Sequence, residues 1–178
     1  VPAEFAVGVF ELLAEAGSEF GLANAGYYAI NALRLEKGYR AFGTELNPDY
    51  GPVEAGLIFA TKLKTDIDFL GRKAVEAAKA SGVRRRIVSF ILNDAHAMMW
   101  GGELLLRDGV GAGQVTSAAF GTTIGSCVGL AYVWRPDGAV VTPDWINEGT
   151  WQVNIGGTVV SMRVQLGAPY DPKSERVR

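Results

Sequence analysis

The stretch that decides the fold is Leu33-Arg34-Leu35-Glu36-Lys37-Gly38-Tyr39-Arg40, followed by Phe42-Gly43-Thr44-Glu45-Leu46 and Pro52-Val53-Glu54-Ala55-Gly56-Leu57. It places more charged, aromatic and glycine residues in one short connection than a generic loop requires. The glycines and prolines of residues 39–56 are typical of turns. An irregular stretch of this length inside a compact domain is usually functional or packed against something. We therefore look for a site here first.

Helical spacing dominates the chain before this stretch. Between Val7 and Phe20, apolar residues recur every three or four positions with glutamates between them, which predicts an amphipathic helix that stops at Gly21. A second helix is predicted from about Ala25 to Glu36, capped by Asn24, with Tyr28 and Leu33 facing inward. Gly38 ends it.

Beyond residue 56 the pattern changes from helical to β-like. Leu57 to Leu63 predicts a strand, and a third helix is expected over about Lys73 to Ala80. Short β-like runs then follow at residues 86–92, 102–107, 114–119, 126–133, 151–155 and 158–165. Asp108-Gly109 and Gly156-Gly157 are hairpin turns by composition. Six short strands with such turns predict a small antiparallel barrel or sandwich. We place a domain boundary at residues 83 and 84.

Composition limits the classes of function. The 178 residues are 48% hydrophobic and 20% charged, with a net charge of −2, so we expect a globular core and no nucleic-acid partner. One histidine (His96) and one cysteine (Cys127, in a strand-like run) permit neither an intrachain disulfide nor an ordinary zinc site. We find no secretory signal or membrane-spanning run, and expect the cytoplasm, or the mitochondrial matrix in a eukaryote.

Two interpretations of the turn region remain open from its residues alone. Arg34, Lys37 and Arg40 flank a surface to which Tyr39 adds a flat face, and this combination suits an aromatic ligand that carries carboxylates. In the alternative interpretation Glu36, Glu45 and Glu54 pair with the same cations, and the network only holds an irregular loop in place.

The ordered motifs resemble a known family. Downstream of the first stretch they are Lys64, Asp68-Phe69-Leu70-Gly71-Arg72, Gly101-Gly102-Glu103, Val115-Thr116-Ser117-Ala118 and Leu130-Ala131-Tyr132-Val133. Together they resemble the glycine-cleavage T-protein (aminomethyltransferase) superfamily, over about residues 20–170. The Lys37-Gly38-Tyr39-Arg40 form is more similar to the folate-binding C-terminal region of sarcosine and dimethylglycine dehydrogenases.

The resemblance implies an α+β fold: the C-terminal part of the aminomethyltransferase folate-binding domain (residues 1–83), followed by a small antiparallel Greek-key-like β-barrel (residues 84–178). In the family, domains surround a folate channel, and a one-carbon unit passes from a small amine substrate to tetrahydrofolate. The aspartate and glutamate that assist there lie N-terminal to this sequence, as does the FAD domain of the dehydrogenase branch. We therefore expect a C-terminal fragment that is inactive alone.

The carry-over of site residues is limited to the second half of the family site. Tyr39 matches a position that lines the folate channel, whereas Ile30 stands where T-proteins carry a folate-contacting arginine. With Arg34 or Arg40 as the substitute cation, we assign cofactor binding to Tyr39, Arg34, Arg40 and Glu45, and no catalytic residue. Ile30 and the missing upstream motif favour an alternative, a non-catalytic module that contacts an upstream domain or a partner subunit.

Overall fold

The computed structural model describes residues 1–176 and groups the chain into two compact units, Val1–Ile30 and Asn31–Arg178. The first unit contains the 3-10 turn Ala3–Phe5, helix α1 (Ala6–Gly17) and the 3-10 turn Ser18–Phe20. Gly21 then ends the helical run in the left-handed conformation, with φ of 69°. The prediction of a helix that stops at Gly21 is therefore confirmed.

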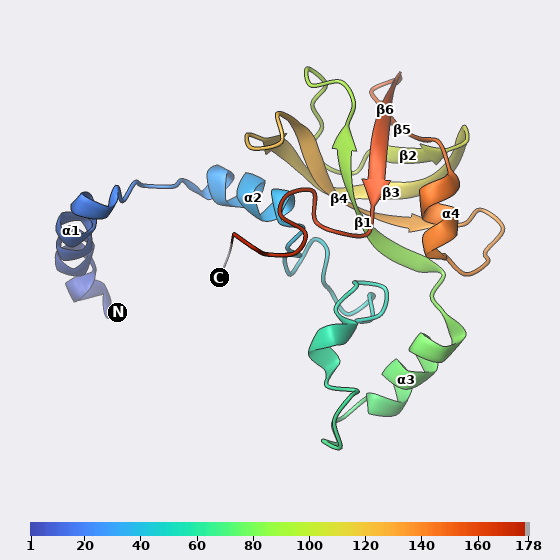
Figure 1. Ribbon diagram of the computed structural model, residues 1–178, viewed down its shortest axis with the longest axis horizontal. Coiled ribbons are helices and arrows are strands. Elements are labelled where there is room, and N and C mark those ends of the chain that lie inside the picture. The colour runs from blue at the N-terminus through green and yellow to red at the C-terminus, as the bar shows by residue number, and fades with distance from the viewer. Residues whose placement is uncertain (177–178) are drawn as a thin grey trace. The chain divides into compact units, whose positions relative to one another are not determined.

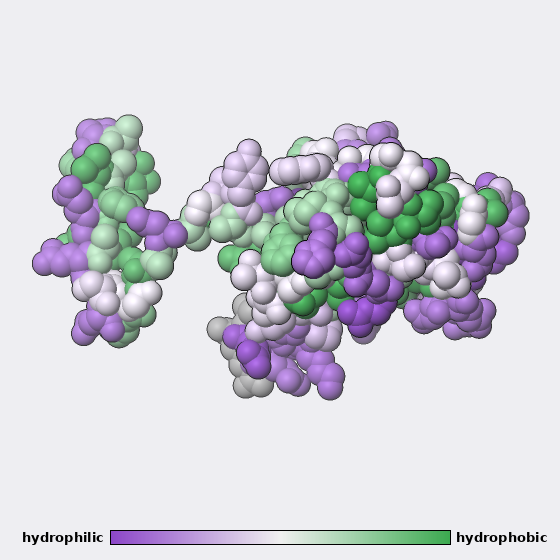
Figure 2. All heavy atoms as spheres, turned by 90° about the horizontal axis from the view of Figure 1, so that it is seen from above, coloured by the Kyte–Doolittle hydropathy of each residue, from purple (hydrophilic) through white to green (hydrophobic). Residues whose placement is uncertain are grey.

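No residue of the first unit is buried. Its large apolar side chains are exposed, and they lie on several sides of α1: Val7, Phe10, Leu12 and Leu13, with Phe5, Phe20 and Leu22 at its ends. Figure 2 shows hydrophobic residues in green over the surface of this helix. A patch of this kind on a folded protein marks an interaction surface.

Helix α2 (Tyr27–Glu36) agrees with the second predicted helix, and the division between the units falls within it. The inward positions were wrong, because Tyr28 and Leu33 are exposed, whereas Leu35 and Glu36 at the end of the helix are buried. Helix α3 (Arg72–Ser81) confirms the third prediction and ends at Gly82.

Six strands form a closed antiparallel barrel in the second unit (Figure 1). They are β1 (Arg85–Leu92), β2 (Leu104–Arg107), β3 (Val110–Gly121), β4 (Ser126–Trp134), β5 (Trp151–Ile155) and β6 (Thr158–Gln165), in the order β1-β4-β3-β2-β5-β6. The core is apolar and includes Phe90, Leu105, Cys127 and Val153. The predicted barrel is thus confirmed, with Cys127 buried in a strand as expected. The domain boundary at residues 83 and 84, just before β1, remains a proposal.

One predicted element is wrong, and one element was not predicted. Leu57 to Leu63 is not a strand but contains the 3-10 turn Ile58–Thr61, which ends at Lys62 in the left-handed conformation. Closure of the barrel leaves no free strand edge for a seventh strand to pair with, and Ala60 N–H bonds locally to the Leu57 carbonyl. Helix α4 (Pro143–Glu148) was missed, although Thr142 caps it and proline starts it.

One position in the barrel has room only for glycine, because neighbouring backbone and side-chain atoms approach its Cα closely. Gly129 lies in β4, where a Cβ atom would clash with the Ser117 carbonyl oxygen and with the Phe90 ring. Gly111 in β3 has more room, since a Cβ atom there would lie 3.5 Å from a Leu104 methyl group.

We therefore predict that Gly129→Ala lowers the free energy of unfolding by about 1–3 kcal/mol, because the added methyl group overpacks the core. Gly111→Ala is the matched control and should change stability by less than about 0.5 kcal/mol. Urea denaturation measures both. Equal effects of the two substitutions would contradict the close packing at Gly129.

Candidate functional site

The site begins at the end of α2, where Gly38 reverses the chain. Gly38 has φ of 64°, its N–H bonds to the Leu35 carbonyl, and Tyr39 N–H bonds to the Arg34 carbonyl at 2.8 Å. This is a Schellman motif, which favours glycine at the left-handed position. A Cβ atom on Gly38 would lie within 3.4 Å of Ser89 and Ala168. The turn therefore fixes the direction in which Tyr39 leaves the helix.

Glu45 is the polar centre behind this turn, and its side chain has no solvent exposure. Its Oε2 atom accepts hydrogen bonds from Arg34 Nη1 at 2.8 Å, Ala41 N at 2.9 Å and Thr44 Oγ1 at 2.9 Å. Its Oε1 atom accepts from the hydroxyl groups of Thr116 and Ser117. Every part of the carboxylate is thus hydrogen-bonded, which is the condition for burying a charge.

The strand β3 supplies two neighbouring hydroxyl groups to Glu45 because its register shifts. The shift falls between Val115 and Ser117, so Thr116 is an extra residue opposite β4. In a regular strand, successive side chains point to opposite faces; a bulge breaks this alternation. The sequence contained the Val115-Thr116-Ser117 motif, but only the bulge shows why both hydroxyl groups face one carboxylate.

Arg34 and Arg40 are both committed to contacts within the protein. Arg34 Nη1 also donates to the Tyr39 carbonyl at 3.0 Å, and Arg34 Nη2 donates to Ser117 Oγ at 3.1 Å. Arg40 Nη1 donates to the Gly38 carbonyl at 2.7 Å, and its Nε donates to the Ala55 carbonyl at 3.0 Å. Burial lowers the pKa of Arg40. The two cations hold the turn and the loop in position.

A cavity of about 500 Å³ lies beside the turn. One wall comes from residues 37–59, including Lys37, Tyr39, Arg40, Leu57 and Phe59, and the other comes from residues 166–174 after β6. The side chain of Tyr39 is 53% exposed, so one aromatic face is available to a ligand. The cavity thus combines a flat aromatic group, a guanidinium group and apolar side chains.

The structure brings the four predicted residues together in two layers. Tyr39 and Arg40 line the cavity, whereas Arg34 and Glu45 lie behind it as an ion pair. The alternative interpretation, pairing among neighbouring charges, is confirmed for Arg34 and Glu45 alone. Three other charged residues have partners outside the set: Lys37 bonds Asp171, Glu54 bonds Arg85, and Glu36 accepts from the backbone N–H groups of Thr123 and Ile124.

Two arginines at the start of β1, Arg85 and Arg86, contact the loop that follows α2. Arg85 contacts Glu54 at 3.1 Å and lies over the Tyr50 ring, and Arg86 Nη1 donates to the Val53 carbonyl at 2.8 Å. Tyr50 in turn stacks on Tyr132, with ring centroids 3.9 Å apart. These contacts attach the 47–56 part of the loop to the start of the barrel.

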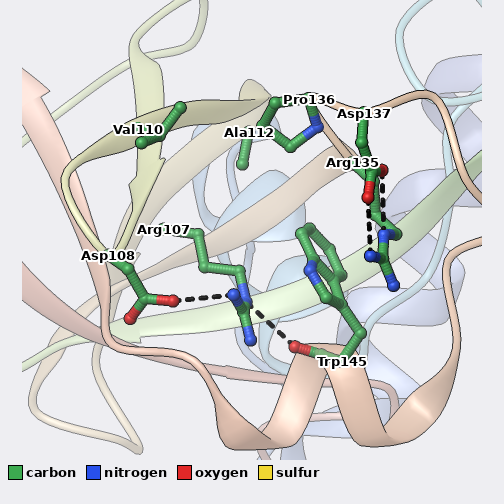
Figure 3. A pocket seen from close by; sticks show the side chains of 8 residues that line it. All are labelled: Arg107, Asp108, Val110, Ala112, Arg135, Pro136, Asp137 and Trp145. Carbon is green, nitrogen blue, oxygen red and sulfur yellow. Dashed lines mark hydrogen bonds and ion pairs between the residues drawn. The ribbon is translucent and has the colours of Figure 1, made fainter.

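A second cavity, of about 270 Å³, lies elsewhere on the barrel (Figure 3). Figure 3 shows Arg107 and Arg135 on either side of the Trp145 ring. Arg107 donates to the Trp145 carbonyl and to Asp108, and Arg135 forms a two-bonded pair with Asp137. Since each guanidinium group already has a carboxylate partner, we interpret this cluster as the attachment of α4 to the barrel.

Comparison with known proteins agrees with this architecture. The family model "GCVT N-terminal domain" matches residues 1–65, and "Glycine cleavage T-protein C-terminal barrel domain" matches residues 85–171. A crystal structure of the glycine cleavage system aminomethyltransferase T from Bartonella henselae aligns with a TM-score of 0.72 at 24% identity, covering 92% of this chain and 44% of that chain. This structural alignment establishes a shared fold.

The chain therefore belongs to the glycine-cleavage T-protein family. Mitochondrial sarcosine dehydrogenase of Homo sapiens is 39% identical over all 178 residues, which are 19% of its length. The mitochondrial pyruvate dehydrogenase phosphatase regulatory subunit of Mus musculus is 37% identical over 93% of this chain and 20% of its own length. The chain thus spans about a fifth of these relatives. The family resemblance of the sequence motifs is confirmed.

The buried carboxylate makes stability depend on pH. Burial alone would raise the pKa of Glu45, but hydrogen bonds from Ser117, Ala41, Thr116 and Thr44 outweigh it and lower the pKa. A folded pKa below the unfolded value of about 4.3 means that Glu45 stabilises the fold fully above that pH. This contribution is lost as the pH falls through the folded pKa.

We predict that Glu45→Gln lowers the free energy of unfolding at pH 7 by about 3 kcal/mol, because Arg34 loses its buried partner. The difference from the wild type should shrink below about pH 4, as the wild-type carboxylate becomes protonated. Glu76→Gln, which removes an exposed partner of Arg72, is the control. Guanidinium chloride denaturation at several pH values measures this, and a pH-independent difference would contradict it.

Proposed function

We propose that this chain forms the barrel-side part of a tetrahydrofolate site in a one-carbon transfer protein of the sarcosine dehydrogenase type. The observation that carries the proposal is the cavity wall formed by Tyr39 and Arg40 on a rigid backing. A folate has a flat ring system and carboxylates, which fit an exposed aromatic face and a guanidinium group. The family membership and the resemblance to the dehydrogenase branch support the same ligand.

In this proposal the residues of the chain bind and orient rather than transfer protons. Tyr39 stacks on a ring of the folate, and Arg40 attracts a carboxylate while its other N–H groups hold the loop. Arg34 and Glu45 keep the turn in place from behind. When bound, tetrahydrofolate supplies the nitrogen that receives the one-carbon unit. Placing that nitrogen is a positioning and electrostatic task.

In this proposal the catalytic acid and the binding sites for the amine substrate and FAD lie in other parts of the whole protein. Relatives are about five times longer than the matched region, which leaves room for such parts.

The exposed apolar surface of α1 supports a further proposal: this surface packs against an upstream domain or a partner subunit. The mitochondrial names of the relatives favour the mitochondrial matrix if the source is a eukaryote. None of the helices within residues 1–176 is long and apolar enough to cross a membrane.

A second candidate function is a non-catalytic contact module that keeps the family barrel without using folate. The mouse relative supports it, because that protein is named as a regulatory subunit of a phosphatase. Ile30, at a position where T-proteins carry a folate-contacting arginine, points the same way. The two functions differ in one property, the binding of tetrahydrofolate.

We predict that Tyr39→Ala in the full-length protein weakens tetrahydrofolate binding by about 1–3 kcal/mol, the scale of one aromatic stacking contact. Phe42→Ala is the control, since Phe42 is also aromatic and exposed but does not line the cavity. Isothermal titration calorimetry measures both. Unchanged affinity in Tyr39→Ala would refute the role of Tyr39, and no binding by the wild type would favour the contact module.

We also predict that the 178-residue chain alone transfers no one-carbon unit to tetrahydrofolate. Native mass spectrometry of the natural gene product shows whether the catalytic and flavin-binding parts belong to the same chain or to a partner. A much heavier single chain, or a 19 kDa chain bound to a flavin-containing partner, agrees with the proposal. A free chain of that mass would contradict it.

A further inference from the structure

The wall of the cavity that follows β6 has no regular secondary structure. This wall segment, residues 166–174, contributes Leu166, Gly167, Ala168, Asp171, Pro172 and Ser174 to the lining. Figure 1 shows it in red, returning from the barrel to the loop that follows α2. None of its residues is fully buried, although the side chain of Asp171 has little solvent exposure. An element with few buried contacts opens at low free-energy cost.

One buried ion pair connects the wall segment to the opposite side of the cavity. Lys37 Nζ donates to the Asp171 carbonyl oxygen at 2.8 Å, to Asp171 Oδ2 at 3.0 Å and to Ser174 Oγ at 3.4 Å. The side chains of Lys37 and Asp171 are only 11% and 7% exposed. A second link is the hydrogen bond from Tyr170 N to the Glu36 carbonyl. Residues 134 positions apart are thus joined at the cavity rim.

The backbone around this pair needs external support. Asp171 and Ser174 both have positive φ angles, 44° and 53°, which are unfavourable for residues with a Cβ atom. Asp171 also accepts hydrogen bonds from the N–H groups of Glu175 and Arg176, which close a tight turn. The ammonium group of Lys37 contacts both strained residues. Removing it leaves a buried carboxylate without its cation in a turn that is already strained.

We infer that residues 166–174 are a movable wall of the cavity, held closed by the Lys37–Asp171 pair, and that ligand exchange requires this pair to open. The inference rests on the proposed function only for the identity of the ligand. Lys37 is then a positioning residue: its charge is used to hold the wall and is not available to bind an anion. The sequence predicted that Lys37 helps to bind an anionic ligand. In the structure the anion that pairs with Lys37 is the carboxylate of Asp171.

The first test measures the wall without any folate. In Lys37→Met, amide hydrogen exchange at residues 170–176 should become faster by roughly tenfold or more, while exchange in β3 and β4 stays unchanged. A cysteine introduced by Leu57→Cys, in the opposite wall, should react several-fold faster with iodoacetamide in the Lys37→Met background. Cys127 gives little background, because it is buried and burial raises the pKa of its thiol. Lys37→Arg should restore wild-type rates, and Lys79→Met is the control on the exposed end of α3.

The second test concerns retention of the ligand. In the full-length protein, Lys37→Met should accelerate tetrahydrofolate dissociation several-fold in stopped-flow measurements. If the wild type does not bind tetrahydrofolate, the proposed function fails, and the exchange and alkylation rates still decide the inference. Unchanged alkylation of the cysteine introduced by Leu57→Cys would overturn the inference. So would an unchanged rate of tetrahydrofolate dissociation in a variant whose hydrogen exchange shows that the wall has opened. If Lys37→Met fails to fold, Asp171→Asn replaces it, with the same expected directions.

Discussion

The structure depends on the burial of one carboxylate, that of Glu45. An ionised group without solvent contact is tolerated only when its oxygen atoms are fully hydrogen-bonded. The donors come from three separate parts of the chain: helix α2, the loop itself and strand β3. None of these parts can move away without removing hydrogen-bond donors from the buried charge. The Glu45 network therefore fixes the loop to the barrel, although the loop has no regular secondary structure.

The position of the candidate ligand-binding groups follows from this constraint. Arg34 Nη1 donates both to Glu45 and to the Tyr39 carbonyl, so the Glu45 network also holds the turn at Gly38. The turn directs the ring of Tyr39 outward and brings Arg40 to the cavity. Side chains held in this way are pre-organised for binding, which reduces the entropy lost when a ligand binds. The opposite wall is joined to this side by the Lys37–Asp171 pair and by one backbone hydrogen bond, from Tyr170 N to the Glu36 carbonyl. The site thus has one side fixed by a large network and one side held by few contacts.

Local sequence signals predicted most elements because the responsible interactions are local. Asp108 and Gly109 both adopt positive φ angles, 51° and 80°, as a two-residue hairpin requires. Helix α4 was within reach of the same reasoning, since Thr142 and Pro143 are ordinary start signals. The apolar run at residues 57–63 misled the prediction, because strand formation depends on a free neighbouring edge, and the barrel had none. The exposed positions of Tyr28 and Leu33 were equally beyond the reach of periodicity.

The sequence by itself determined the barrel, the loop that carries the site, the family and the four candidate residues. Only the tertiary structure divided those four into Tyr39 and Arg40 at the cavity and Arg34 and Glu45 behind it. It also revealed the hydroxyl groups of β3 and the pairing of Lys37 with Asp171. The physical reason is that periodicity and turn chemistry act between near neighbours, whereas the partner of a buried charge is chosen by chain folding over tens to hundreds of residues. A strand bulge or a returning terminus has no counterpart in local pattern.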